Sequence, residues 1–250
     1  MSAPAMNPVA SEIMCSSFHN LGESRTDLIE RNLEIVESSI IDMTPCGKHT
    51  VLPVVANPVD VFTYYAQKFR NCQSSKYLAA TQVDSARLRG ILANKCGAAA
   101  SSINAYVLGE HGESQVVAWS HIAIGDIPIE QLTIAAEDAV DIDRLAVAED
   151  TKQKASAIVE NEGSTAFGTA AVVVSVCRSW PHDTRDVLTI SHFQYEFGIC
   201  LSTRFLLVRK GITKRIEMPL EKAEQQALLK SAKSLSEVVS EAEGKQKGSK

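Results

Sequence analysis

Several features that mark common protein classes are missing from this 250-residue sequence. The net charge of −5 provides no basic face for nucleic acid, because concentrated lysines occur only at the C-terminal end. No apolar run approaches the roughly 20 residues that a membrane-spanning helix requires. The first twenty residues contain neither the basic nor the apolar region of a secretory signal. We therefore expect a cytoplasmic protein that binds neither nucleic acid nor a membrane.

Clustered cysteines are missing as well. The six cysteines lie far apart in the sequence, at Cys15, Cys46, Cys72, Cys96, Cys177 and Cys200. Disulfide scaffolds and zinc sites need closer spacing, so we expect reduced thiols and no bound metal. The sequence does contain 45% hydrophobic and 22% charged residues, as soluble globular proteins do. At this length it can bury one large core or two modest ones.

The hydrophobic pattern predicts an α/β arrangement in the first third of the chain. A helix from Ser24 to Pro45 precedes two short β-branched strands, at about 50–56 and 77–81. Each strand is followed by a helix, which favours parallel pairing.

The rhythm changes after Gly97. Strand-like segments at 103–108 and 115–122 precede two helices, and an antiparallel strand series and a final amphipathic helix follow. We accordingly expect an irregular N-terminus (1–20), a domain boundary near 72–82 and a disordered tail (244–250).

His111 is the most informative residue. It lies between Gly109 and Gly112, in a turn that follows the strand-like segment. Glycines allow the backbone to approach closely and leave the imidazole uncovered, as an acid/base group requires. The alternative is an ordinary polar loop residue.

Two partners for this histidine occur upstream. A carboxylate such as Asp84 could fix the tautomer of His111 and stabilise its cationic form. Arg87, one helical turn further on, shares a face with Asp84 and could capture a substrate carboxylate. The alternative is a surface ion pair between Asp84 and Arg87.

Arg25 and Asn57 are further candidates. Arg25 follows Gly22 in a polar segment that could form a moving loop, or simply a helix N-terminus capped by Ser24. Asn57 ends a buried strand and could present its amide to a ligand at the carboxyl edge of the sheet. Alternatively, Asn57 only starts the next helix.

These segments, in this order, resemble the L-lactate dehydrogenases of the lactate/malate dehydrogenase family. The matching motifs are Gly22-Glu23-Ser24-Arg25, Val55-Ala56-Asn57-Pro58-Val59-Asp60, Asp84-Ser85-Ala86-Arg87, Gly109-Glu110-His111-Gly112-Glu113-Ser114 and Glu162-Gly163-Ser164-Thr165. The resemblance runs from about residue 20 to about 240. It implies a remnant of a Rossmann parallel sheet in the C-terminal half of a nucleotide-binding domain (21–80), followed by an α+β catalytic domain (81–243). It also implies NAD-dependent hydride transfer between (S)-lactate and pyruvate, and a homo-oligomer.

The resemblance implies a role for each matching residue. His111 would donate a proton to the pyruvate ketone, or accept it back, while Asp84 orients the imidazole. Arg25 would polarise the ketone, Arg87 would clamp the substrate carboxylate, and Thr165 would form the pocket wall associated with lactate.

Three positions would contact the cofactor or lie beside it. Asn57 would contact both the substrate and the nicotinamide, with Val55 beside it. Ser38 falls where the family can contact the cofactor, although on an amphipathic helix it can also simply face solvent.

The sequence departs from the family in one large respect. It contains no Gly-x-Gly-x-x-Gly turn after an N-terminal strand, and its first glycine is Gly22. We therefore expect very weak NADH affinity or none. A second hypothesis is a truncated or incomplete family member that retains substrate residues but cannot hold the dinucleotide. A third, malate dehydrogenase, is disfavoured by Thr165 and by the Gly-Glu-Ser-Arg motif.

Overall fold

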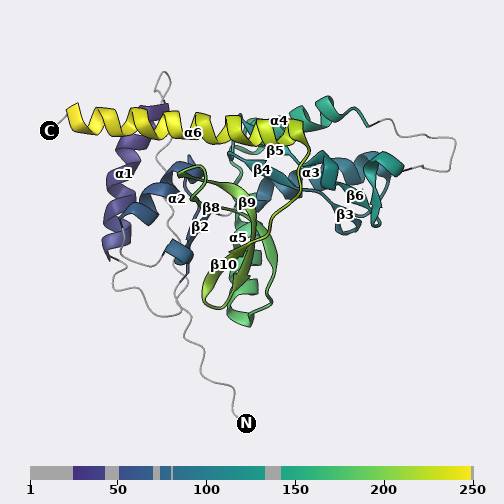
Figure 1. Cartoon of the computed structure of the whole chain (residues 1–250), viewed down its shortest axis with the longest axis horizontal. Helices are drawn as coiled ribbons and strands as arrows, with labels where there is room; N and C mark the ends of the chain where they lie inside the picture. Colours follow the sequence, from purple (N-terminus) through teal and green to yellow (C-terminus); the bar gives the residue numbers. More distant parts are fainter. Residues whose placement is uncertain (1–24, 43–50, 70–73, 80, 133–141, 249–250) are drawn as a thin grey trace, which may run out of the picture.

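A seven-stranded sheet organises the molecule. The computed structural model describes residues 25–42, 51–69, 74–79, 81–132 and 142–248. Its main sheet has the order β1-β2-β8-β9-β4-β5, and β10 pairs with β9 (Figure 1). The strands are β1 (Leu52–Val54), β2 (Tyr77–Ala79), β4 (Val107–Gly109), β5 (Gln115–Val117), β8 (Val187–Gln194), β9 (Ile199–Val208) and β10 (Gly211–Arg215). A second sheet contains β3 (Ile103–Asn104), β6 (Ala123–Ile124) and β7 (Ile127–Pro128).

The strand directions agree with the prediction of parallel strands early in the chain and an antiparallel series later. β1 and β2 are parallel, as the pattern of alternating strands and helices predicts, whereas the other paired strands of the main sheet are antiparallel. One bridge, Ala79 to Ser191, pairs β2 with β8 in antiparallel fashion. The parallel pair β1-β2 and the antiparallel strands therefore form one continuous sheet.

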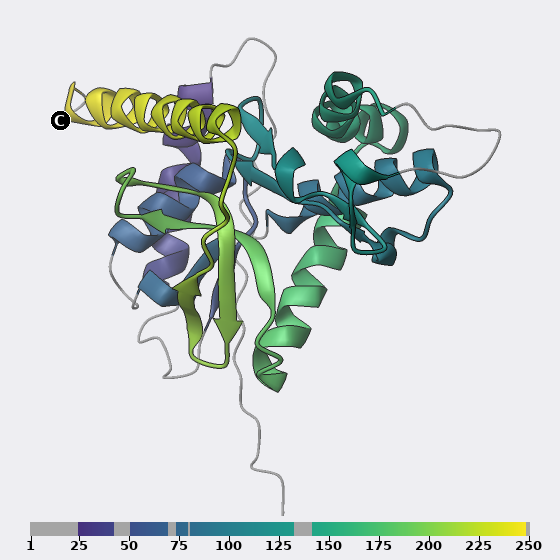
Figure 2. The same ribbon diagram turned by 45° about the vertical axis from the view of Figure 1, so that its right-hand side comes forward.

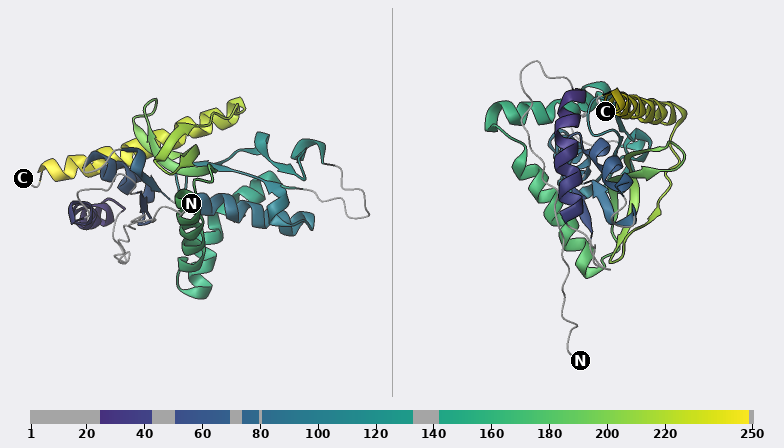
Figure 3. Two further views of the ribbon diagram at one scale, coloured as in Figure 1. Left: turned by 90° about the horizontal axis from the view of Figure 1, so that it is seen from below. Right: turned by 90° about the vertical axis from the view of Figure 1, so that its left-hand side faces the viewer.

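Helices cover both faces of this sheet (Figure 2). They are α1 (Arg25–Asp42), α2 (Val59–Lys68), α3 (Gln82–Cys96), α4 (Arg144–Glu162), α5 (Ala166–His182) and α6 (Lys222–Gly248). Because side chains alternate along a strand, Tyr77 and Ala79 pack with α1, α2 and α6, while Leu78 packs with α5. α6 crosses over one end of α1 (Figures 1 and 3). None of the described helices is long and apolar enough to cross a membrane.

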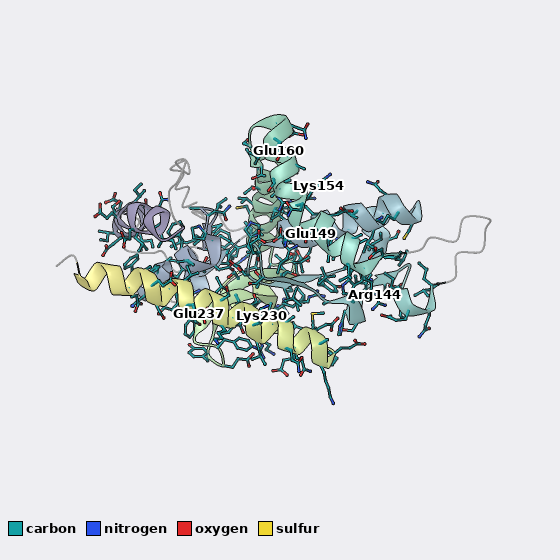
Figure 4. All side chains as sticks on the ribbon, turned by 90° about the horizontal axis from the view of Figure 1, so that it is seen from above. Arg144, Glu149, Lys154, Glu160, Lys230 and Glu237 are labelled. Carbon is teal, nitrogen blue, oxygen red and sulfur yellow. The ribbon has the colours of Figure 1, made fainter. Side chains whose placement is uncertain are left out.

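A third core joins α3, α4 and the small sheet. Its members include Leu88, Leu92, Ile103 and Val147. The outer faces of α4 and α6 carry exposed charged side chains, as the labelled residues Arg144, Glu149, Lys154, Glu160, Lys230 and Glu237 illustrate (Figure 4). The core between α3, α4 and the small sheet also contains Val107 of β4 and Val117 of β5, so it is continuous with the main sheet.

Three local expectations differ from the structure. The segment predicted as one strand at 103–108 is split between β3 and β4, which belong to different sheets. The strand predicted at 115–122 ends at Val117, and a 3₁₀ turn over Trp119–His121 follows. α6 runs through to Gly248, where the sequence predicts a disordered tail from Gly244. The predicted irregular N-terminus, 1–20, lies outside the described residues.

Candidate active site

The loop that carries His111 is tied down on both sides of the histidine. It starts at Gly109, whose φ of +84° suits glycine, and a Cβ there would lie 2.7 Å from the Ser231 hydroxyl of α6. The Glu110 N–H donates to that hydroxyl at 2.8 Å. The buried Glu110 carboxylate accepts from the Ser114 hydroxyl at 2.5 Å and from the Ser114 N–H at 3.2 Å. The turn around His111 is therefore held by α6 and by its own glutamate.

The structure brings three of the predicted residues into direct contact. His111 Nδ1 lies 2.5 Å from Asp84 Oδ2, and Arg87 donates through Nη1 to Asp84 Oδ1 at 2.9 Å. The side chains of Asp84 and Arg87 are 6% and 11% exposed, against 20% for His111. Nε2 of His111 makes no hydrogen bond with the described residues, so it is the nitrogen left for a ligand. Asp84 and Arg87 thus form a largely buried pair behind the histidine, not a solvated surface pair.

Carboxylates reverse the effect of burial on His111. Burial alone would lower the pKa of this imidazole. The charge of Asp84 and its hydrogen bond, together with the charge of Asp60, outweigh burial and the nearby Arg87 guanidinium, and raise the pKa above its ordinary value of 6.5. The histidine is thereby favoured in the protonated form that donates a proton.

A pocket of about 480 Å³ lies beside Arg87, between α3 and the junction of α4 with α5. Thr165, half-buried at the N-terminal end of α5, lines it together with Arg87. Val83 and Val172 supply part of its apolar wall. Arg89 and Glu162 line the pocket as well, whereas His111 is not one of its lining residues. The two cations, the hydroxyl and the apolar side chains of this pocket suit the binding of a small carboxylic acid.

Asn57 and Val55 lie at the carboxyl end of β1. Val55 is half-buried and packs against Val83, Val172 and Val173, next to the pocket wall. Asn57 is exposed in the turn between β1 and α2, and among the described residues it makes no hydrogen bond with His111 or Arg87. Val55 thus joins the site through packing, whereas Asn57 only shares its edge of the sheet.

The remaining two candidates are placed less fully. The backbone of α1 begins at Arg25, whose side chain lies outside the described part of the chain. Ser38 is exposed, and its hydroxyl donates to the Ile35 carbonyl of its own helix at 3.1 Å. Ser38 is therefore occupied locally.

A dinucleotide fits these residues only in part. The edge formed by Val55 and Asn57 suits a nicotinamide ring, which needs an apolar wall and an amide partner. The phosphates need backbone N–H groups at a glycine-rich helix N-terminus. Within the described residues, the turns that follow β1 and β2 contain no glycine, and the helices after them carry Asp60 and Asp84 in their first turns. The described residues therefore fit the nicotinamide end and offer no phosphate cradle.

Sequence reasoning missed two residues of this site. Asp60 was visible within the Asn-Pro-Val-Asp motif, but there it resembles an ordinary acidic residue in the first turn of a helix. Ser231 gave no signal, because a serine on an amphipathic helix is unremarkable.

The described residues include no group of three or more His, Cys, Asp or Glu side chains that could hold a metal ion.

Sequence comparisons match this chain to one protein family. The lactate/malate dehydrogenase C-terminal α/β domain matches residues 81–246, and the NAD-binding domain of the same family matches residues 12–79. An L-lactate dehydrogenase of Limosilactobacillus reuteri is 35% identical over 226 residues, which are 88% of this chain and 69% of that protein. One from Streptococcus sanguinis is 33% identical over the same shares.

Solved structures share the fold. A lactate dehydrogenase from a Medee basin deep-sea metagenome superimposes with a TM-score of 0.88 at 24% identity, over 94% of this chain and 76% of that one. The minor L-lactate dehydrogenase of Enterococcus mundtii gives 0.86 at 23% identity, over 92% and 75%. Taken with the family matches and the relatives above 30% identity, these similarities show that the chain belongs to the lactate/malate dehydrogenase family, whose members are NAD-dependent oxidoreductases.

Proposed function

We propose that this chain interconverts (S)-lactate and pyruvate, with His111 as the group that exchanges the proton. The observation that carries the proposal is the 2.5 Å contact between His111 and Asp84, which is continued by Arg87 into the pocket that Thr165 lines. The names of the relatives, L-lactate dehydrogenases at 33–35% identity, support the same substrate pair.

His111 would act through Nε2. In the direction of reduction, the protonated imidazole donates this proton to the ketone oxygen, while Asp84 keeps the Nδ1 proton in place. In the reverse direction, neutral Nε2 accepts the hydroxyl proton of lactate, and Asp84 stabilises the imidazolium that forms. A bound nicotinamide would supply or remove the hydride.

Arg87 would hold the substrate carboxylate. One of its amino groups is engaged by Asp84, which fixes the guanidinium plane and leaves its other N–H groups for a second, bidentate contact. Thr165 presents a neutral pocket wall, suited to the methyl group of lactate more than to the second carboxylate of malate. Arg25, from the start of α1, would polarise the ketone.

A second candidate function is binding of the acid without redox turnover. It is favoured by the absence of a glycine-rich turn after β1 and β2 in the described residues, since a dinucleotide without its phosphate contacts binds weakly.

An assay of NADH oxidation with pyruvate or oxaloacetate tests the proposal. We expect pyruvate to be the better substrate, and His111→Asn to lower turnover by about 10²–10⁴-fold. His182→Asn, at the exposed end of α5, is the matched control and should leave turnover unchanged. Faster oxaloacetate reduction would instead indicate a malate dehydrogenase.

A fluorescence titration with NADH separates the two candidates. We expect very weak binding, so turnover must be measured over a wide NADH range. If no turnover occurs at any NADH concentration, while pyruvate still shifts the His111 ring resonances, the second candidate is correct. Micromolar NADH binding would contradict the expectation of weak affinity.

A further inference from the structure

His111 is held by a second buried carboxylate, on its backbone side. Asp60, in the first turn of α2, is 2% exposed, and its Oδ2 accepts a hydrogen bond from the His111 N–H at 2.7 Å. Asp84 binds the ring of the same residue from α3. Two carboxylates from different helices therefore form hydrogen bonds with His111, one at its main-chain N–H and the other at its imidazole.

Asp60 lies in a costly environment for a charge. Burial raises the pKa of Asp60 to about 6, although the Ser191 hydroxyl, the His111 N–H and the charge of His111 act in the opposite direction. The titratable or polar groups that face it come from three elements: Glu110 and His111 after β4, Ser191 on β8, and Cys200 on β9, whose own pKa is raised by burial and by Asp60. Of these neighbours only His111 can carry a positive charge.

The free-energy cost of burying the charge of Asp60 is informative about the role of this residue. A neutral amide oxygen could accept the His111 N–H without placing a carboxylate in the interior. A carboxylate adds one thing to that hydrogen bond, namely a negative charge beside the imidazole. The charge gains most when the imidazole is protonated, which is the state needed for proton donation.

We infer that Asp60 is a positioning residue for His111: its hydrogen bond fixes the histidine main chain, and its charge supports the protonated imidazole together with Asp84. This inference rests on the proposed function, in which His111 carries the proton. Asp60 is three residues beyond Asn57 and belongs to the segment that matches the NAD-binding domain of the family. The contact therefore couples the nucleotide-type half of the chain to the acid/base group of the catalytic half.

Titration of the His111 ring by NMR in the full chain tests the role of the charge without requiring turnover. Asp60→Asn keeps an oxygen acceptor and removes the charge, so we expect the His111 midpoint to fall by about 0.5–1 pH unit, a three- to tenfold loss of proton affinity. Glu224→Gln is the matched control. Glu224 is also buried and also accepts a backbone N–H, from Ser120, but it has no contact with His111. An unchanged midpoint in Asp60→Asn would overturn the inference.

Amide exchange at His111 tests the role of the hydrogen bond. Protection of the His111 N–H should persist in Asp60→Asn and be lost in Asp60→Ala. Equal protection in the two variants would contradict the positioning role. Loss of protection in Asp60→Asn would also contradict it, whether or not Asp60→Ala folds.

Kinetics provide a separate readout where turnover is measurable. Asp60→Asn should lower kcat several-fold and leave KM for pyruvate unchanged, because Asp60 contacts the histidine and not the pocket. A wild-type chain that shows no turnover would refute the proposed function alone, since the titration and exchange results stand independently of it.

Discussion

Two half-buried histidines of this molecule have opposite acid/base properties. His111 faces Asp84 and Asp60, and its pKa is raised above 6.5. His192, on β8, lies 2.9 Å from the Gln67 amide nitrogen and 3.2 Å from the Tyr77 carbonyl, and burial lowers its pKa to about 4.

The difference lies in the partners. Burial disfavours the charged form of both rings, but only His111 has carboxylates that compensate for it. The ring of His192 instead packs edge-on against Phe205, with ring centroids 5.2 Å apart. A histidine in the interior is therefore a structural side chain by default, and it becomes an acid/base candidate through the groups behind it.

Removal of the carboxylate behind His111 should have the largest effect. In Asp84→Asn the effect of burial is no longer outweighed by the Asp84 charge, so we expect the His111 pKa to fall below 6.5 and pyruvate turnover to fall by about 10²–10⁴-fold. The ring titration and the turnover rate measure the two effects. Asp150→Asn, an exposed change on α4, is the control and should alter neither. A His111 pKa that stays raised in Asp84→Asn would contradict the explanation that carboxylate partners make His111 differ from His192.

Protonation of His192 should lower the free energy of unfolding in acid. Its folded pKa of about 4 lies below the unfolded value of 6.5, so its contribution is complete above pH 6.5 and is lost as the pH falls toward 4. The shift corresponds to about 3 kcal/mol. We expect His192→Gln to lack this part of the acid-induced loss, as urea unfolding at pH 7 and pH 4.5 would show. His182→Gln should retain the wild-type pH dependence, and a wild-type slope in His192→Gln would contradict this assignment.

A carboxylate placed beside His192 should make its acid/base behaviour resemble that of His111. Gln67→Glu puts a charge where the amide nitrogen now lies 2.9 Å from Nδ1, so we expect the pKa of His192 to rise by about 2 units. Gln67→Met, which adds no charge, is the matched control. Should both variants leave the NMR titration of His192 unchanged, partner charge would not explain the difference between the two rings.

The sequence predicts the residues that surround the His111 imidazole, and misses those that hold the main chain of its loop. His111, Asp84 and Arg87 are predictable because a turn histidine, a carboxylate and an arginine at helical spacing have a shared chemistry. Asp60 and Ser231 act through main-chain groups of the loop, and a main-chain contact leaves no residue pattern.

Fold prediction has a similar limit. The helix predicted from Ser24 to Pro45 contains α1, Arg25–Asp42. The segment 103–108 is predicted as one strand because five of its six residues are apolar, the exception being Asn104. Nothing local reveals that the chain changes sheets at Ala105 and Tyr106, since that depends on partners far away in the sequence.

The Ser231 contact gives the C-terminal helix a role that its distance from the pocket conceals. A chain cut short before this serine would leave the Glu110 amide in the interior with no acceptor, and would empty the space beside Gly109 that the Ser231 side chain now fills. The loss would be felt as a disordered histidine turn, although every residue named in the chemistry would still be present. The last helix is therefore needed to order the loop that carries His111, although Ser231 lies 121 residues beyond Glu110 in the sequence.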